Sequence, residues 1–96
     1  MSDRRVTDQV RIVGSGLLGA SIGLALGAKG VDVIVDDASP AARRLAIDYG
    51  AGRAPAEGDA PGVIVVAVPP DVTAEVVAAE LARFPDALVT DVASVK

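Results

Sequence analysis

Residues 10–37 read VRIVGSGLLGASIGLALGAKGVDVIVDD, and this stretch decides the fold. The apolar run at residues 10–13 predicts a short buried strand, which stops where a glycine-rich turn begins. A helical pattern occupies residues 17–29, and a β-branched strand at residues 31–35 leads into two aspartates. A strand, a glycine turn, a helix and a second strand with an acidic end are typical of a dinucleotide-binding βαβ unit.

The turn has the glycine spacing G-x-G-x-x-G, and each of its glycines has a separate physical role. Gly14 permits the tight turn, Gly16 lets a pyrophosphate approach the backbone, and Gly19 lets the helix lie close to the sheet. The unpaired N–H groups and the partial positive charge of the helix N-terminus favour the phosphates. The predicted cofactor-binding residues of this segment are Gly14, Ser15, Gly16, Leu17, Leu18 and Gly19.

Asp36 and Asp37 follow the second strand where the ribose of an adenosine would lie, so both are candidate cofactor-binding residues. A carboxylate there accepts hydrogen bonds from the ribose hydroxyls. It also repels a 2′-phosphate by roughly 4 kcal/mol at about 4 Å and an effective dielectric near 20. The sequence therefore predicts NAD, with Asp37 favoured because it stands just before the next helix. Arg43 and Arg44 could instead hold a 2′-phosphate, but their place within that helix favours a solvated face.

The rest of the chain continues the alternation of strand and helix. Ser39 and Pro40 predict the N-cap and first residue of a helix that ends at Gly50. Residues 51–62 are rich in proline and glycine and predict a loop with room for a short edge strand. Six apolar residues at 63–68 predict a strand that is buried on both faces.

A third helix is predicted to begin at Asp71 or Thr73 and to end before Pro85, and a last strand follows at residues 87–90. The apolar side of this helix is expected to consist of Val76, Val77, Leu81 and Phe84. The whole pattern predicts an α/β fold, a Rossmann-like doubly wound parallel sheet in three α/β/α layers. Residues 1–96 then form one dinucleotide-binding domain, with residues 1–9 as a flexible lead-in.

Composition excludes several classes of function. A formal net charge of -4 with nine basic residues argues against nucleic-acid binding. The absence of cysteine excludes disulfides, and the absence of histidine removes the commonest acid–base group near neutral pH. Residues 12–28 carry no charge, but the stretch is short and glycine-rich for a membrane span. We expect a cytoplasmic domain without metal, membrane or nucleic-acid partners.

Two further segments lie beyond the carboxyl ends of the predicted strands, where doubly wound sheets bind ligands. Val68, Pro69 and Pro70 are predicted to form a rigid wall beside the nicotinamide, although a simple strand stop would also explain the prolines. Residues 90–96 read TDVASVK and follow the last strand. On spacing alone, this second segment is equally well an ordinary polar loop.

Three segments, in this order, resemble the prephenate and arogenate dehydrogenases of tyrosine biosynthesis. They are residues 14–26 (GSGLLGASIGLAL), residues 65–69 (VVAVP) and residues 90–96, the last being similar to the family's T-D-x-x-S-x-K. Ala93 departs from the glycine usual in that motif. The resemblance implies NAD(P)-dependent oxidative decarboxylation of a cyclohexadienol, giving 4-hydroxyphenylpyruvate or tyrosine, by a homodimer.

By position, the resemblance implies a catalytic role for Ser94 near the substrate hydroxyl and the family's catalytic histidine, with Lys96 at the same rim. That histidine and the helical substrate domain follow this segment in the family, and the 96 residues contain neither. We therefore expect a fragment that binds NAD weakly and does not turn over prephenate or arogenate.

Two other classes of protein share the βαβ unit. One comprises reductases of the β-hydroxyacid dehydrogenase or pyrroline-carboxylate reductase type, against which residues 91–96 favour the tyrosine pathway. The other is a non-catalytic nucleotide-binding domain. The choice between prephenate and arogenate stays open, because the residues that select the substrate lie largely outside this segment.

Overall fold

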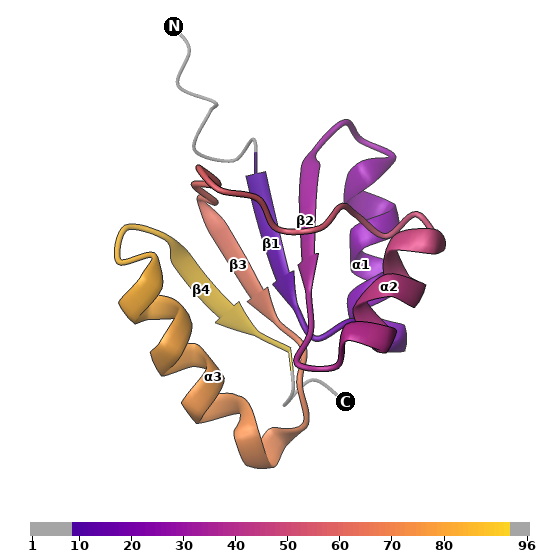
Figure 1. The fold of residues 1–96 in the computed structure, drawn as a ribbon. Coiled ribbons are helices and arrows are strands. Elements are labelled where there is room, and N and C mark those ends of the chain that lie inside the picture. Colours follow the sequence, from indigo (N-terminus) through magenta and orange to yellow (C-terminus); the bar gives the residue numbers. More distant parts are fainter. Residues whose placement is uncertain (1–8, 93–96) are drawn as a thin grey trace, which may run out of the picture.

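A computed structural model describes residues 9–92 as a four-stranded parallel sheet between helices (Figure 1). The strands lie in the order β2-β1-β3-β4, so β1 is central and pairs with both β2 and β3. The elements in chain order are β1 (Gln9–Val13), α1 (Leu17–Gly27), β2 (Asp32–Asp36), α2 (Pro40–Asp48), β3 (Val63–Val66), α3 (Pro70–Arg83) and β4 (Leu88–Asp91).

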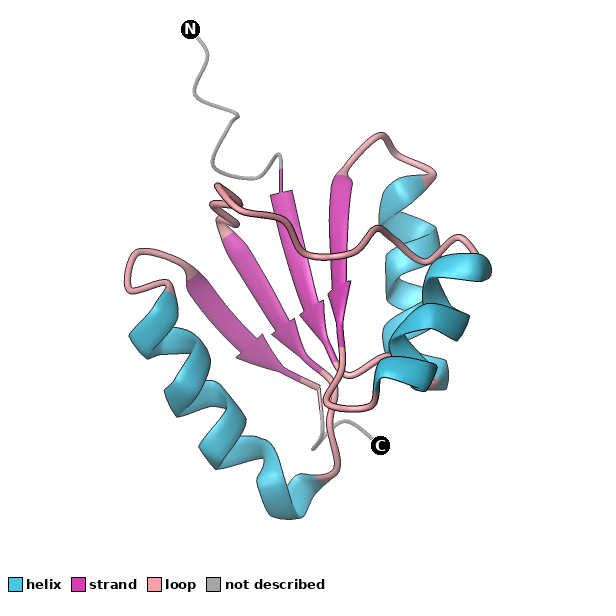
Figure 2. Ribbon diagram, in the orientation of Figure 1, coloured by secondary structure: helices cyan, strands magenta, loops and turns pink. Residues whose placement is uncertain are grey.

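Helices cover both faces of the sheet, as Figure 2 shows. Val10 and Ile12 of β1 pack in one apolar cluster with Ala20 of α1 and Ala46 of α2. The side chain between them, Arg11, points to the other face and bonds to α3. Because successive side chains of a strand alternate between faces, α1 and α2 form one layer and α3 another. The predicted three-layer doubly wound fold is confirmed.

Local signals in the sequence set several element ends. The hydroxyl of Ser39 accepts a hydrogen bond from the backbone N–H of Ala42 at 3.2 Å, and Pro40 is the first helical residue of α2. Gly50 follows α2 with φ of 92°, a left-handed conformation that glycine adopts at little cost. These caps hold α2 in the place that the sequence predicts.

Residues 51–62 connect α2 to β3, and the short edge strand that the sequence suggests is reduced to one isolated bridge. Arg53 forms a parallel bridge with Ile34, and its backbone N–H and C=O bond to β2 at 2.9 Å each. The connection then passes the amino end of β1, where the side chain of Gln9 accepts a bond from the backbone N–H of Ala60 at 2.8 Å. Gln9 is thus the first residue of β1 rather than the end of the lead-in.

The face of the sheet toward α3 has a charged centre. Arg11 is 3% exposed, and its guanidinium forms a two-point ion pair with Glu80 of α3, at 2.7 and 3.1 Å. Glu80 is the buried residue of α3, whereas Leu81, expected on the apolar side, is 44% exposed. The apolar-face prediction for α3 is wrong at this position, because a buried arginine requires an anion opposite it.

α3 also begins earlier than predicted. Pro69 is its N-cap and Pro70 its first residue. Proline suits the first turn of a helix because it needs no N–H partner there, so the prolines start this helix instead of only ending the strand. In the described part of the chain, residues 9–92, every helix is too short or too polar to span a membrane.

Candidate dinucleotide-binding site

The chain turns sharply at Gly14, directly after β1. Gly14 has φ of 101°, and its backbone N–H donates to the carbonyl oxygen of Asp36 at 2.8 Å. A Cβ atom added here would overlap the carbonyl oxygen of Ala67. Gly14 is therefore required by the protein's own backbone, both for its conformation and for the close approach of the segment after β3.

Gly16 differs from the other two glycines of the motif. It is the N-cap of α1 with φ of -69°, and no atom lies within 4 Å of a Cβ built on it. A Cβ on Gly19, by contrast, would overlap the carbonyl oxygen of Gly14. Neither packing nor conformation requires a glycine at position 16, so the open space in front of it is available to a ligand.

The N-terminus of α1 faces this space, and its backbone N–H groups are not bound by a capping side chain. It has no side-chain cap, and its first turn carries no acidic residue. Backbone N–H groups at such a helix start are unpaired and favour an anion. The start of α1 therefore fits the pyrophosphate of a dinucleotide.

An open cavity of about 680 Å³ lies at the carboxyl ends of the strands, over this turn. Its volume falls in the ordinary range of small-molecule sites. In Figure 1 the strand arrowheads converge here, near the start of α1 and the segment between β3 and α3. The predicted site residues that line it are Gly14, Gly16, Leu17, Leu18, Asp37, Val68 and Pro69.

Four other predicted site residues lie outside the lining of this cavity. Gly19 is buried between α1 and β1, and Ser15 is buried beside Asp37. Pro70 lines a separate groove on α3, and Asp36 turns toward Arg11. Ser94, with Lys96, lies outside the described residues.

Asp37 joins the glycine turn to the start of α2. One carboxylate oxygen, Oδ2, accepts bonds from the backbone N–H and the hydroxyl of Ser15, at 2.8 and 2.9 Å. The other, Oδ1, accepts from the backbone N–H of Ser39 at 2.8 Å. Burial acts to raise the pKa of Asp37, but the hydrogen bonds from Ser15 and Ser39 outweigh it and lower the pKa. A negative charge therefore faces the cavity at neutral pH.

Asp36 has different partners. Its carboxylate accepts from Arg11 at 3.1 Å and from Arg43 at 3.4 Å, and also from the backbone N–H of Asp37 at 2.9 Å. Arg44 is 79% exposed at its side chain and pairs with Asp48 one turn away. Asp36 thus anchors the end of β2, and Arg43 is paired with it.

The charge on Asp37 makes stability depend on pH. Since folding lowers its pKa, the unfolded chain binds more protons, and the stabilisation is present above the ordinary value of 3.8 and lost as pH falls through the lowered value. We expect Asp37→Asn to make the loss of stability below about pH 4 shallower, measured by urea denaturation between about pH 2 and 7.

This acid dependence should be reduced in Asp37→Asn but not abolished. Hydrogen bonds from Arg53 also lower the pKa of Asp32 and Asp59, and both remain in the variant. An unchanged slope in Asp37→Asn would contradict the hydrogen bonding of this carboxylate.

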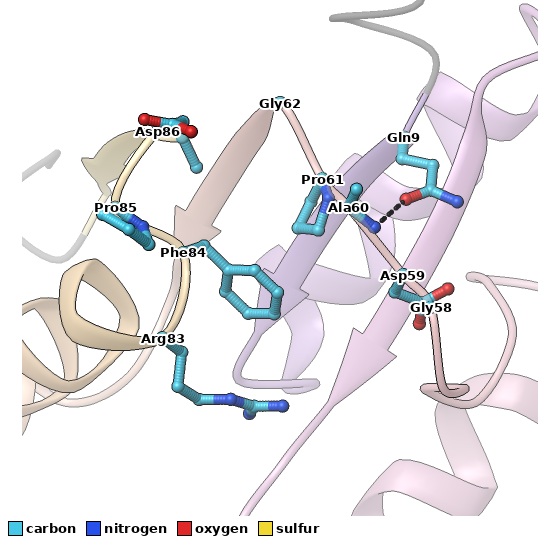
Figure 3. A pocket seen from close by; sticks show the side chains of 11 residues that line it. Gln9, Gly58, Asp59, Ala60, Pro61, Gly62, Arg83, Phe84, Pro85 and Asp86 are labelled. Carbon is cyan, nitrogen blue, oxygen red and sulfur yellow. Dashed lines mark hydrogen bonds between the residues drawn. The ribbon is translucent and has the colours of Figure 1, made fainter.

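A second cavity, of about 610 Å³, lies at the opposite end of the sheet (Figure 3). Phe84, Arg83 and Pro61 line it, together with Gln9 at the start of β1. The ring of Phe84 lies 5.6 Å from the guanidinium carbon of Arg11 and 5.0 Å from that of Arg83. None of the predicted site residues lines this cavity, and it is remote from the carboxyl edge where doubly wound sheets bind ligands.

Sequence reasoning missed Arg11 and Glu80 as a pair that supports the site through Asp36. Burial lowers the pKa of Arg11, but bonds and charges from Glu80 and Asp36 more than offset this, so its pKa is raised and it stays charged. One signal was available, because an arginine inside a buried apolar strand must find an anion. The spacing of the motifs does not say where in the chain that anion lies.

The fold, the turn and the acidic end of β2 together define a dinucleotide-binding domain of the Rossmann class. Residues 9–94 match the model of a protein family described as NADP oxidoreductase, coenzyme F420-dependent. The match covers nearly the whole chain, and the chain belongs to this family.

Two similar proteins are of the kind that the three sequence motifs resemble, a prephenate and an arogenate dehydrogenase. The chain is 45% identical over 85 residues to a probable prephenate dehydrogenase, NovF, of Streptomyces niveus, covering 88% of this chain and 24% of that protein. Its structure matches the crystal structure of Synechocystis arogenate dehydrogenase with a TM-score of 0.79 and 26% identity, covering 92% of this chain and 34% of that one. The chain thus spans about a quarter and a third of these relatives, and the predicted resemblance to their nucleotide-binding domain is confirmed.

Proposed function

We propose that this domain binds NAD as the cofactor-binding part of a prephenate or arogenate dehydrogenase. The observation that carries the proposal is the open space at Gly16, which faces the uncapped start of α1 in a cavity that Asp37 also lines. A glycine that the protein's own packing does not require is consistent with close approach by a ligand.

Three parts of the fold would each bind a different part of the cofactor. The start of α1 holds the pyrophosphate, and Asp37 accepts from the adenosine ribose. Val68 and Pro69, which line the cavity after β3, pack beside the nicotinamide, and Leu17 and Leu18 add apolar surface at the same rim. When bound, NAD supplies the hydride acceptor of the reaction, and the domain supplies binding, orientation and the local charge.

NAD is the proposed cofactor rather than NADP because of the charges around the ribose. Asp37 would repel a 2′-phosphate, and the residue after it is the uncharged Ala38. Arg43, a candidate partner for such a phosphate, is paired with Asp36. Parallel titrations with NAD and NADP test the choice, and equal or tighter binding of NADP would overturn it.

We further propose that the longer protein oxidatively decarboxylates prephenate or arogenate as a homodimer, with Ser94 beside the substrate. The 96 residues alone contain no histidine. They are therefore expected to bind NAD without turning over either substrate. Production of NADH from prephenate by this chain alone, followed by absorbance, would contradict that expectation.

Gly16→Val tests the site directly. The side chain would fill the space in front of α1, so we expect the dissociation constant for NAD to rise at least about tenfold. Because φ at this position suits any residue and no protein atom is near, the free energy of unfolding should fall by no more than about 1 kcal/mol. Calorimetric titration and urea denaturation measure the two effects.

Gly27→Ala is the matched control for Gly16→Val. Gly27 lies at the other end of α1, and an added Cβ there also meets no atom within 4 Å. This variant should bind NAD as the unmodified chain does. If Gly16→Val also binds NAD normally, position 16 is not where the cofactor lies and the proposed function loses its main support.

A further inference from the structure

The carboxylate that faces the cavity is already largely occupied by the protein's own donors. Asp37 accepts three hydrogen bonds, two from Ser15 and one from the backbone N–H of Ser39. An ionised carboxylate offers about four acceptor positions. One position is therefore left for a ligand while these three bonds are intact.

An adenosine ribose has two neighbouring hydroxyls, and hydrogen bonds from both to Asp37 need two acceptor positions. One of the protein's own three donors must therefore leave Asp37 before both bonds can form. The two N–H donors belong to the backbone of the glycine turn and of the start of α2, where the fold fixes them. The hydroxyl of Ser15 is attached by one rotatable bond, so it can leave without moving the chain.

We propose that the hydroxyl of Ser15 stands in for a ribose hydroxyl on Asp37 and is displaced when the dinucleotide binds. Ser15 is on this basis a specificity-determining residue, although it does not line the cavity. It competes with the second ribose hydroxyl, so it lowers affinity for ligands that have both hydroxyls and not for ligands that have one. The inference rests on the proposed binding of a dinucleotide at this site.

Removing the hydroxyl gives the test. In Ser15→Ala the backbone N–H bond to Asp37 is retained and the carboxylate gains a free position. A net hydrogen bond corresponds to about a fivefold change in affinity, so ADP should bind about fivefold tighter. The affinity for 2′-deoxy-ADP, which lacks one ribose hydroxyl, should stay the same.

The two ligands are titrated into the unmodified chain, Ser15→Ala and Ser21→Ala, and NMR amide shifts give the dissociation constants. Ser21 is an exposed serine of α1, the helix that follows the glycine turn, and its replacement should change neither constant. In an Asp37→Asn background, Ser15→Ala should no longer change the ratio of the two constants. Urea denaturation of each variant establishes that it is folded.

The outcomes separate the inference from the function on which it rests. If Ser15→Ala binds both ligands more weakly, or both more tightly by the same factor, the hydroxyl only braces the turn and the competition is refuted. If the unmodified chain binds neither ADP nor NAD, the proposed function fails and this inference fails with it. The proposed function and the inference are both supported if Ser15→Ala raises the ratio of the dissociation constant of 2′-deoxy-ADP to that of ADP about fivefold, and does so only when Asp37 is present.

Discussion

Glu80→Ala is expected to lower the free energy of unfolding by about 3 kcal/mol. The change leaves Arg11, a residue only 3% exposed at the centre of the sheet, without the carboxylate that binds its guanidinium at two points. Asp36 retains a single bond to Arg11 at 3.1 Å, which keeps the loss toward the lower end for a broken buried pair. Since small domains unfold at a cost of only about 5–15 kcal/mol, urea denaturation should show a large shift of the midpoint.

Two further variants show whether the effect belongs to the buried charge. Glu75→Ala removes an exposed acid from the same helix and should change stability by less than about 0.5 kcal/mol. Arg11→Met combined with Glu80→Leu removes both charges and should recover most of the loss, because apolar residues replace a buried pair at little cost. A loss below about 1 kcal/mol in Glu80→Ala would mean that water reaches the guanidinium.

Gly23→Ala is expected to lower the free energy of unfolding by about 3 kcal/mol. A Cβ atom on Gly23 would overlap the carbonyl oxygen of Ala51, where the chain leaves α2 for the edge bridge at Arg53. That oxygen belongs to the backbone, so the clash cannot be relieved by rotating a side chain. α1 or the connection after α2 must move, and the apolar cluster around Ala20 and Ala46 loosens with it.

The neighbouring glycine of α1 gives a control with the opposite sign. Gly27 lies one turn further along, and an added Cβ meets no atom within 4 Å. Alanine there should stabilise the helix by about 0.5 kcal/mol, because it restricts the unfolded chain without crowding the folded one. Thermal unfolding followed by circular dichroism compares Gly23→Ala with Gly27→Ala. Equal effects of the two variants on stability would contradict the close approach at Gly23.

Features that arise from short-range chemistry could be predicted from the sequence. The cap at Ser39 and the stop at Gly50 need only a few neighbouring residues, and the structure has both in place. The turn at Gly14 follows from the same local reasoning, and the alternation of strand and helix predicts that the sheet is parallel. The glycine motif was therefore located in space by its flanking strand and helix.

Features that depend on contacts between distant residues were not predictable in this way. Nothing near Glu80 indicates that it is buried, since its partner lies on β1. Likewise, Asp36 ends β2 and Asp37 follows it, and the distant Arg11 bonds to Asp36 while Asp37 faces the cavity.

The pairing of Arg11 with Glu80 also bears on the order of folding. The two residues are 69 positions apart in the chain, so during synthesis the cation is made long before its anion. If Arg11 were buried before α3 had formed, the free-energy cost of removing its charge from water would be offset only by Asp36. We therefore expect the sheet to pack stably around β1 only once α3, which carries Glu80, is present.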